Sequence, residues 1–150
     1  MQMDDCIKWM SIGARHTAMH MDRALAPYGL NASQYMYVVE VCEHPGLTQD
    51  RFFQIFYIHP SNVTRAIVAL EKLGFLERRS NPKDRRTFCV YPTRKALDIY
   101  PEILRLRQQW QEQILAGLAP GTRAELQAAL KQAALCAVAR NEEEVPDHAD

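Results

Sequence analysis

Two short stretches of the chain carry side chains that suit contact with a polyanion. The first offers hydroxyl, amide and guanidinium groups from Ser61, Asn62, Thr64 and Arg65. The second gathers three cations around one acid: Lys83, Asp84, Arg85 and Arg86. An arginine can bind a guanine edge through two parallel hydrogen bonds, and hydroxyl groups commonly bind phosphate oxygens. These residue types therefore predict contact with a nucleic acid.

The distribution of charge supports this interpretation. The chain has 18 basic and 18 acidic residues, so its formal net charge is zero. Residues 58–95, however, hold nine basic residues against three acidic ones, a surplus of six positive charges that the rest of the chain balances. A basic segment inside an otherwise acidic chain is an electrostatic footprint for a polyanion.

The elements that would position these side chains begin with three predicted helices. Apolar residues recur at helical spacing over residues 7–25, and this helix should end near Pro27. A second helix should include residues 35–42, and a short third helix should follow Thr48 as its N-cap.

A fourth predicted helix carries the first polar stretch. Pro60 suits its first position, and Gly74 should stop it. Its apolar face should be buried and consists of Val63, Ile67, Leu70 and Leu73. The polar residues then lie on the opposite face, where Arg65 can reach a guanine while Ser61 and Thr64 reach phosphates.

After Gly74 the pattern changes from helix to strand. Residues 75–79 and 87–91 predict a two-stranded hairpin, and the polar loop at 80–86 forms its cationic tip. Such a tip suits the minor groove, where negative potential is concentrated. A long helix should follow Thr93, and a last helix should begin near Pro120. Two short helices joined by a turn and followed by a basic hairpin predict a helix-turn-helix with a wing.

At this point the chain resembles the MarR family of bacterial regulators. The matching motifs are LT at Leu47–Thr48, SNVTR at Ser61–Arg65, LEKLGFLERR at Leu70–Arg79, NPKDRR at Asn81–Arg86 and YPT at Tyr91–Thr93. The chain departs from the family pattern at Phe52–Phe53, where the third helix usually carries a small residue. It also departs at Tyr57–Ile58, where a glycine usually precedes an aliphatic residue, and at Ala96, which replaces an early glycine of the long helix.

The resemblance implies a mainly α (α+β) fold, with a winged helix-turn-helix core flanked by N- and C-terminal dimerisation helices. We expect one domain over residues 1–140, with the DNA-binding lobe at 31–92 and the dimerisation helices at 1–27 and 93–140. Residues 141–150 should form an acidic, disordered tail. By analogy with the family, Asp84 orients an arginine and Arg86 enters the minor groove.

The function that this implies is a sequence-specific transcriptional regulator, a ligand-responsive repressor that binds a pseudo-palindromic operator as a homodimer. A small aromatic effector is expected where the dimerisation helices meet the winged lobe, and the residues proposed to line its site are His16, His20, Tyr35 and Tyr37. The spacing of His16 and His20 would suit a metal ion, but two imidazoles without a third ligand indicate no metal site. No cofactor is expected.

Two alternatives stay open. One is a regulator switched by thiol oxidation, although Cys6 is expected to be a buried or unreactive thiol. The other is a winged helix that binds protein instead of DNA. The sequence has no phosphate-binding glycine loop, no nucleophile elbow and no HExxH motif, so we do not expect an enzyme. It has no apolar run long enough to cross a bilayer, and we expect a cytoplasmic protein.

Overall fold

The N-terminal half of the chain is helical, as predicted. The computed structural model describes residues 4–144. Helix α1 (Cys6–Leu25) begins where the carboxylate of Asp5 accepts a hydrogen bond from the backbone N–H of Lys8 at 3.0 Å. It ends at the short 3-10 helix η1 (Ala26–Tyr28), which contains the predicted stop at Pro27.

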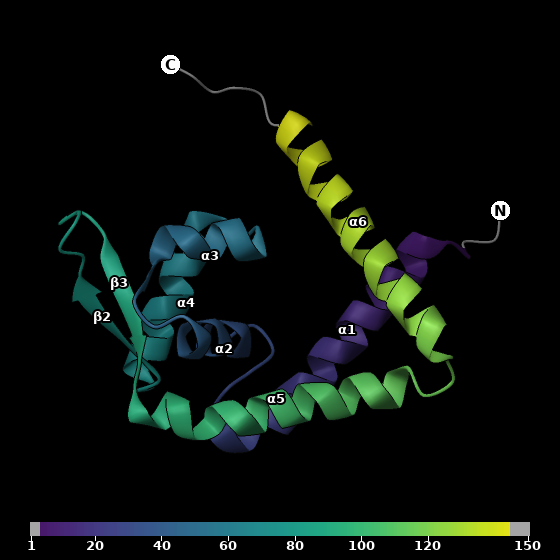
Figure 1. Ribbon diagram of the computed structural model, residues 1–150, viewed down its shortest axis with the longest axis horizontal. Helices are drawn as coiled ribbons and strands as arrows, with labels where there is room; N and C mark the ends of the chain where they lie inside the picture. The colour runs from purple at the N-terminus through teal and green to yellow at the C-terminus, as the bar shows by residue number, and fades with distance from the viewer. Residues whose placement is uncertain (1–3, 145–150) are drawn as a thin grey trace. The chain divides into compact units, whose positions relative to one another are not determined.

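Three helices then form the helix-turn-helix region beside the hairpin (Figure 1). They are α2 (Tyr35–Glu43), α3 (Gln49–Phe56) and α4 (Pro60–Lys72). Pro60 takes the first position of α4, because a residue without a backbone N–H loses nothing there. Thr48 occupies the N-cap position of α3 as predicted, but its side chain makes no capping hydrogen bond.

The wing is a small antiparallel sheet with the strand order β1-β3-β2. Strands β2 (Leu76–Ser80) and β3 (Phe88–Pro92) lie one residue later than the sequence predicted. Strand β1 (Leu47–Thr48) was not predicted, since two residues carry no detectable period. It joins the helix-turn-helix region to the wing by pairing Leu47 with Val90.

The core lies under these elements and is built largely from aliphatic residues. Val63, Ile67 and Leu70 of α4 are fully buried, as their spacing predicted. Leu73 is 40% exposed, so its predicted burial was wrong. It follows the last residue of α4, where the chain reverses at Gly74 and turns the Leu73 side chain out of the buried stripe.

The remaining helices are α5 (Arg94–Ile114) and α6 (Pro120–Glu144). The chain divides into two compact units, one up to Trp110 and one from Gln111 onward. Ala96, Ile99 and Ile103 of α5 are buried in the first unit. In α6, none of the side chains that the structure describes is buried.

The expected tail needs a correction at its start. Residues 141–144 belong to α6, because they continue its backbone hydrogen bonding without a stop signal. The rest of the expected tail lies outside the described residues. Among residues 4–144, no helix is long and apolar enough to cross a membrane.

The glycine that ends α4 leads to a prediction about the free energy of unfolding, in which it is compared with a glycine inside α1. Gly74 has φ +83°, a left-handed conformation that costs other residues about 1–2 kcal/mol. Gly13 lies within α1, and apart from its chain neighbours and the nearby helix backbone no atom lies within 4 Å of the place that a Cβ would take, so alanine there should stabilise by about 0.5–1 kcal/mol. We expect Gly74→Ala to lower the free energy of unfolding and Gly13→Ala to raise it. Urea denaturation at one fixed protein concentration measures both, and changes of the same sign would contradict the prediction.

Candidate nucleic-acid interface

Helix α4 presents two chemically different faces. Val63 and Ile67 are buried, while every one of the predicted contact residues of this helix is exposed: Ser61, Asn62, Thr64 and Arg65. Arg65 donates a hydrogen bond to the side-chain oxygen of Asn62, one turn earlier on the helix. The structure therefore brings the four residues to one solvent-facing surface at the start of α4.

Thr64 also ties α4 to α3. Its hydroxyl donates to the carbonyl oxygen of Pro60 at 3.1 Å and accepts from the side-chain amide of Gln49 at 3.4 Å. The sequence did not indicate this contact between the two helices. It fixes the start of α3 against the exposed face of α4.

The turn between α3 and α4 accommodates the departures from the family pattern. Tyr57 has φ +54°, and it is the only non-glycine residue with positive φ in the described chain. It therefore adopts the left-handed conformation that a glycine would take without strain.

Phe52 is fully buried in an aromatic cluster, with ring centroids 5.3 Å from Tyr37 and 6.1 Å from Phe56. The larger side chain thus becomes part of the core.

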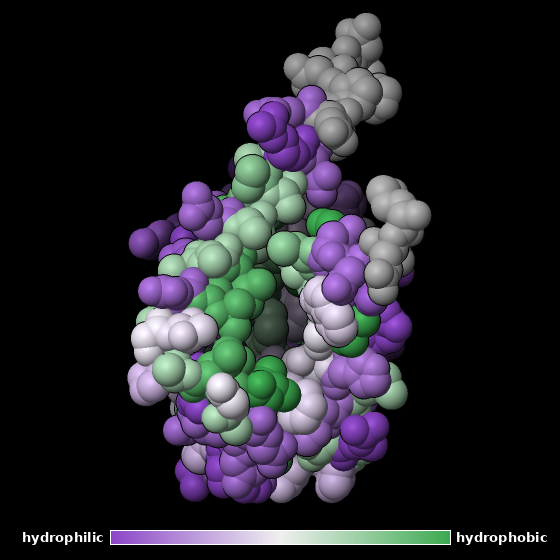
Figure 2. All heavy atoms as spheres, turned by 90° about the vertical axis from the view of Figure 1, so that its right-hand side faces the viewer, coloured by the Kyte–Doolittle hydropathy of each residue, from purple (hydrophilic) through white to green (hydrophobic). Residues whose placement is uncertain are grey.

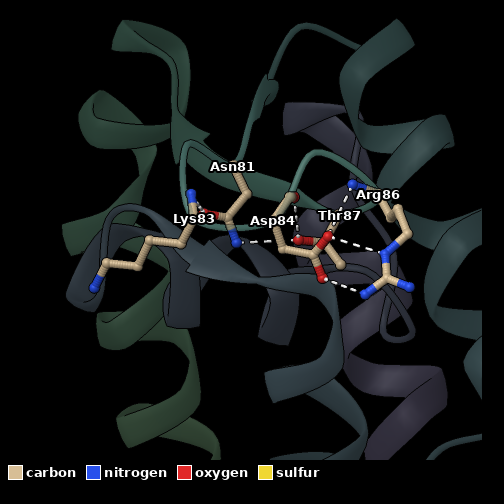
Figure 3. A network of polar contacts seen from close by, with 5 residues as sticks. All are labelled: Asn81, Lys83, Asp84, Arg86 and Thr87. Carbon is tan, nitrogen blue, oxygen red and sulfur yellow. Dashed lines mark hydrogen bonds and ion pairs between the residues drawn. The ribbon is translucent and has the colours of Figure 1, made fainter.

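The tip of the wing is held by its own polar side chains (Figure 3). The Asn81 side-chain oxygen accepts from the backbone N–H of Lys83 at 3.0 Å, and its amide group donates to the hydroxyl of Thr87 at 3.0 Å. The Thr87 hydroxyl in turn donates to the carbonyl oxygen of Asp84 at 3.0 Å. These bonds close the loop at its base, so the backbone that carries the exposed cations is held in one conformation.

Asp84 is the acid within this tip, and it contacts Arg86. The carboxylate accepts from the Arg86 backbone N–H at 3.1 Å and from its Nε at 3.2 Å. The hydrogen bond from the Arg86 side chain, followed by that from its backbone, lowers the pKa of Asp84. Arg86 remains 90% exposed, and Lys83 and Arg85 are exposed as well. Figure 3 shows the Lys83 and Arg86 side chains extending in opposite directions from the loop.

An ion pair connects the wing to α4. Glu71 lies at the end of α4 and Arg78 lies in β2, and their side chains form a two-pronged contact of 3.1 and 3.3 Å. The same carboxylate accepts from the backbone N–H of Arg78 at 3.2 Å. The hydrogen bond from the Arg78 side chain lowers the pKa of Glu71. The exposed surfaces of α4 and of the hairpin are therefore held in one arrangement.

The residues expected to line an effector site lie in different surroundings. Tyr37 packs in the aromatic core, with its ring centroid 5.5 Å from that of Phe56. His20 stacks on Trp110 of α5 with ring centroids 4.0 Å apart, and His16 is exposed. Tyr35 is nearly buried and faces the guanidinium of Arg107, 5.8 Å from its ring centroid. His20 and Tyr35 thus each contact a side chain of α5.

Other reactive side chains lie outside this surface. Glu40, Glu43 and His44 bring ligand atoms within 4.8 Å of one another at the end of α2, a cluster that the sequence did not indicate. All four cysteines are free thiols. Burial raises the pKa of Cys42 to about 11, so this thiol stays protonated at neutral pH. Cys6 is exposed in the first turn of α1. Of the two states expected for this thiol, buried or unreactive, the structure excludes the buried one.

Two helices joined by a turn, with a sheet and a charged hairpin after them, define a winged helix-turn-helix protein. The model of the MarR family matches residues 30–88. The HTH-type transcriptional regulator YwoH of Bacillus subtilis is 30% identical over 103 residues, which cover 69% of this chain and 74% of that relative. The chain belongs to the MarR family.

Two solved structures show the same architecture over most of the chain. The transcriptional regulator SlyA superposes with a TM-score of 0.87 at 26% identity, covering 93% of this chain and 98% of that one. A MarR family regulator from Listeria monocytogenes, complexed with a 26mer DNA, gives a TM-score of 0.85 at 25% identity and covers 92% of both chains. The predicted family and fold class are thereby confirmed.

The contact between Glu71 and Arg78 leads to a prediction about pH. Because the folded state lowers the pKa of Glu71, its contribution to stability is present above the unfolded value of about 4.3 and is lost as pH falls through the lower folded pKa. Both side chains are partly exposed, so we expect Glu71→Gln to cost about 1 kcal/mol or less at neutral pH. Urea denaturation near pH 7 and again below about pH 4 should show this difference shrinking in acid.

Glu77→Gln is the matched control, since Glu77 pairs with Arg79 within the strand and both side chains are more than half exposed. It should change stability less than Glu71→Gln. A Glu71→Gln effect that is equal at both pH values would contradict the assignment.

Proposed function

We propose that this chain is a sequence-specific transcriptional regulator that binds a pseudo-palindromic DNA operator as a homodimer and represses transcription. The observation that carries the proposal is the pairing of an exposed polar face on α4 with a cationic hairpin tip, connected through Glu71 and Arg78. The MarR family regulator complexed with a 26mer DNA supports a DNA ligand. The relatives are named as regulators, which supports a regulatory role over a catalytic one.

Each exposed group has a role suited to its chemistry. Asn62 and Arg65 are at the start of α4, the part of a recognition helix that meets base edges in the major groove. Ser61 and Thr64 would donate to phosphates by turning their hydroxyl groups away from His59 and from the Pro60 carbonyl oxygen, which they contact in the free protein. Arg86, held by Asp84 at the wing tip, would enter the minor groove. Lys83 and Arg85 would contact the flanking phosphates.

The two arginines should differ in how their loss affects binding. Arg65→Ala should cost about 1–3 kcal/mol and relax preference at one base step, because arginine reads a base edge. Arg86→Ala should weaken binding to all sequences and make the salt dependence shallower, because it removes a cation that displaces counterions. Fluorescence anisotropy on a selected duplex and on a random duplex, at several salt concentrations, measures both effects.

Arg140→Ala is a suitable control, since it removes an exposed arginine of α6 that pairs with Glu143. It should leave binding to both duplexes unchanged. If Arg65→Ala and Arg86→Ala also bind both duplexes like the wild type, then α4 and the wing are not the DNA-contact surface.

The homodimer is supported by apolar side chains at both ends of the chain. Ile7 is 71% exposed and Met10 is 42% exposed on α1, while Leu130 is 44% exposed on α6 and Leu126 beside it is half-buried. Figure 2 shows apolar side chains in a band that runs down from the C-terminal end of α6. A 25-residue helix that buries none of its described side chains needs a partner surface.

Loss of these apolar groups should weaken the dimer. We expect the wild type to be dimeric at micromolar concentration, and the double variant Leu126→Glu/Leu130→Glu to dissociate because it places charges in an apolar contact. Lys131→Glu in the same helix is the control for added charge on an exposed position and should remain dimeric. Light scattering measures the mass, and a monomeric wild type would contradict the proposal.

The ligand-responsive part of the proposal concerns α1, α2 and α5. There His20 stacks on Trp110, and Arg107 lies over Tyr35, so flat apolar surface stands beside a cation. This chemistry suits an aromatic carboxylate. A thermal-shift screen of benzoate-like and phenolic compounds tests this part, and a screen in which no compound raises the unfolding temperature would count against it.

A further inference from the structure

The first backbone amides of α4 are all occupied within the protein. Pro60 has no N–H, and the N–H of Ser61 donates to Nδ1 of His59 at 3.2 Å. The N–H groups of Asn62 and Val63 donate to the carbonyl oxygen of His59 at 2.9 and 3.3 Å. A helix N-terminus often binds phosphate through such amides. The start of α4 has none to offer.

The cap that occupies these amides is unusual in its chemistry. Aspartate, asparagine and serine are the preferred N-cap residues, and they cap through an oxygen. Here the cap is the imidazole of His59, whose Nδ1 lies 3.2 Å from the Ser61 amide nitrogen and 2.7 Å from the Ser61 hydroxyl oxygen. In the tautomer that accepts from the amide, Nδ1 carries no proton and the hydroxyl also donates to it. The ring proton of neutral His59 is then on Nε2.

This arrangement gives the ring a donor that faces away from the helix. Nε2 lies across the imidazole from Nδ1, and Nδ1 faces the helix N-terminus. The side chain is exposed, and within residues 4–144 Nε2 has no hydrogen-bond partner. His59 also lies two residues before Ser61, at the end of α4 that would face the duplex.

We propose that His59 is a DNA-contact residue whose Nε2–H donates a hydrogen bond to a phosphate oxygen of the duplex. Nε2 of the imidazole thus replaces the helix amides as the hydrogen-bond donor to phosphate at the start of α4. Its other nitrogen, Nδ1, caps the helix. The proposal rests on the proposed function, since it requires α4 to be the recognition helix. A ring whose Nδ1 accepts the helix amide contributes a hydrogen bond and no net charge, so the contact should fix the position of α4 without displacing a counterion.

The test uses His59→Ser, which keeps an N-cap oxygen for the Ser61 amide and removes the outward N–H. The control is His44→Ser, because His44 is also an exposed histidine at a helix end, the C-cap of α2. The probe is a random-sequence duplex of about 30 base pairs, roughly three helical turns, because a phosphate contact is independent of sequence. Anisotropy titrations at several salt concentrations give the affinity and its salt slope, and thermal unfolding reports the fold.

We expect His59→Ser to lower affinity about tenfold on the random duplex and by the same factor on a duplex selected from a random pool, with an unchanged salt slope. The unfolding temperature should stay within a degree or two of the wild type (~1–2 °C). His44→Ser should bind like the wild type. If His59→Ser proves unstable, His59→Asn keeps a preferred cap with a shorter reach and should show the same loss.

Four results would overturn the proposal. The first three are wild-type affinity in His59→Ser and His59→Asn, an equal loss in His44→Ser, and a loss confined to the selected duplex, which would make His59 a base reader. A shallower salt slope would also overturn it, since His59 would then act as a cation. Failure of the wild type itself to bind any duplex in a salt-dependent way would instead refute the proposed function, so the two failures are distinguishable.

Discussion

The junction between α4 and β2 is the constraint on which the proposed DNA-contact surface depends. Glu71 accepts three hydrogen bonds from Arg78, and Gly74 between them reverses the chain in a left-handed conformation. Thr93 closes the junction from the other side, where its hydroxyl contacts the carbonyl oxygens of Gly74 and Phe75 before α5 begins. One small region thereby sets the positions of α4, the wing and the start of α5.

Acids in the basic segment orient cations without covering them. Asp84 holds Arg86, and Glu77 holds Arg79, yet Arg86 is 90% exposed and Arg79 is 55% exposed. An arginine that is already restricted to one geometry loses less side-chain entropy when it binds a phosphate or a groove. Asp84 and Glu77 therefore reduce the net charge of the segment but hold two of its exposed arginines in defined positions.

Periodic features could be predicted from the sequence, whereas contacts between distant residues could not. The buried face of Val63, Ile67 and Leu70 follows from helical spacing, and the strands were placed within one residue because the pattern changes at Gly74. The stack of His20 on Trp110 joins residues ninety positions apart, and no local pattern encodes it. The pairing of Glu71 with Arg78 depends on the reversal at Gly74, so it appears only once that turn is known. The capping role of His59 was missed because histidine is not among the usual capping residues.

The central claim is that α4 and the wing contact adjacent grooves of one duplex. Dimethyl sulfate footprinting tests it most directly, because the reagent modifies guanine N7 in the major groove and adenine N3 in the minor groove. On a duplex that the protein selects from a random pool, the account predicts protection of guanine N7 in one major groove together with protection of adenine N3 in the minor groove beside it. Protection confined to one groove, or absent from both while the protein is bound, would contradict it.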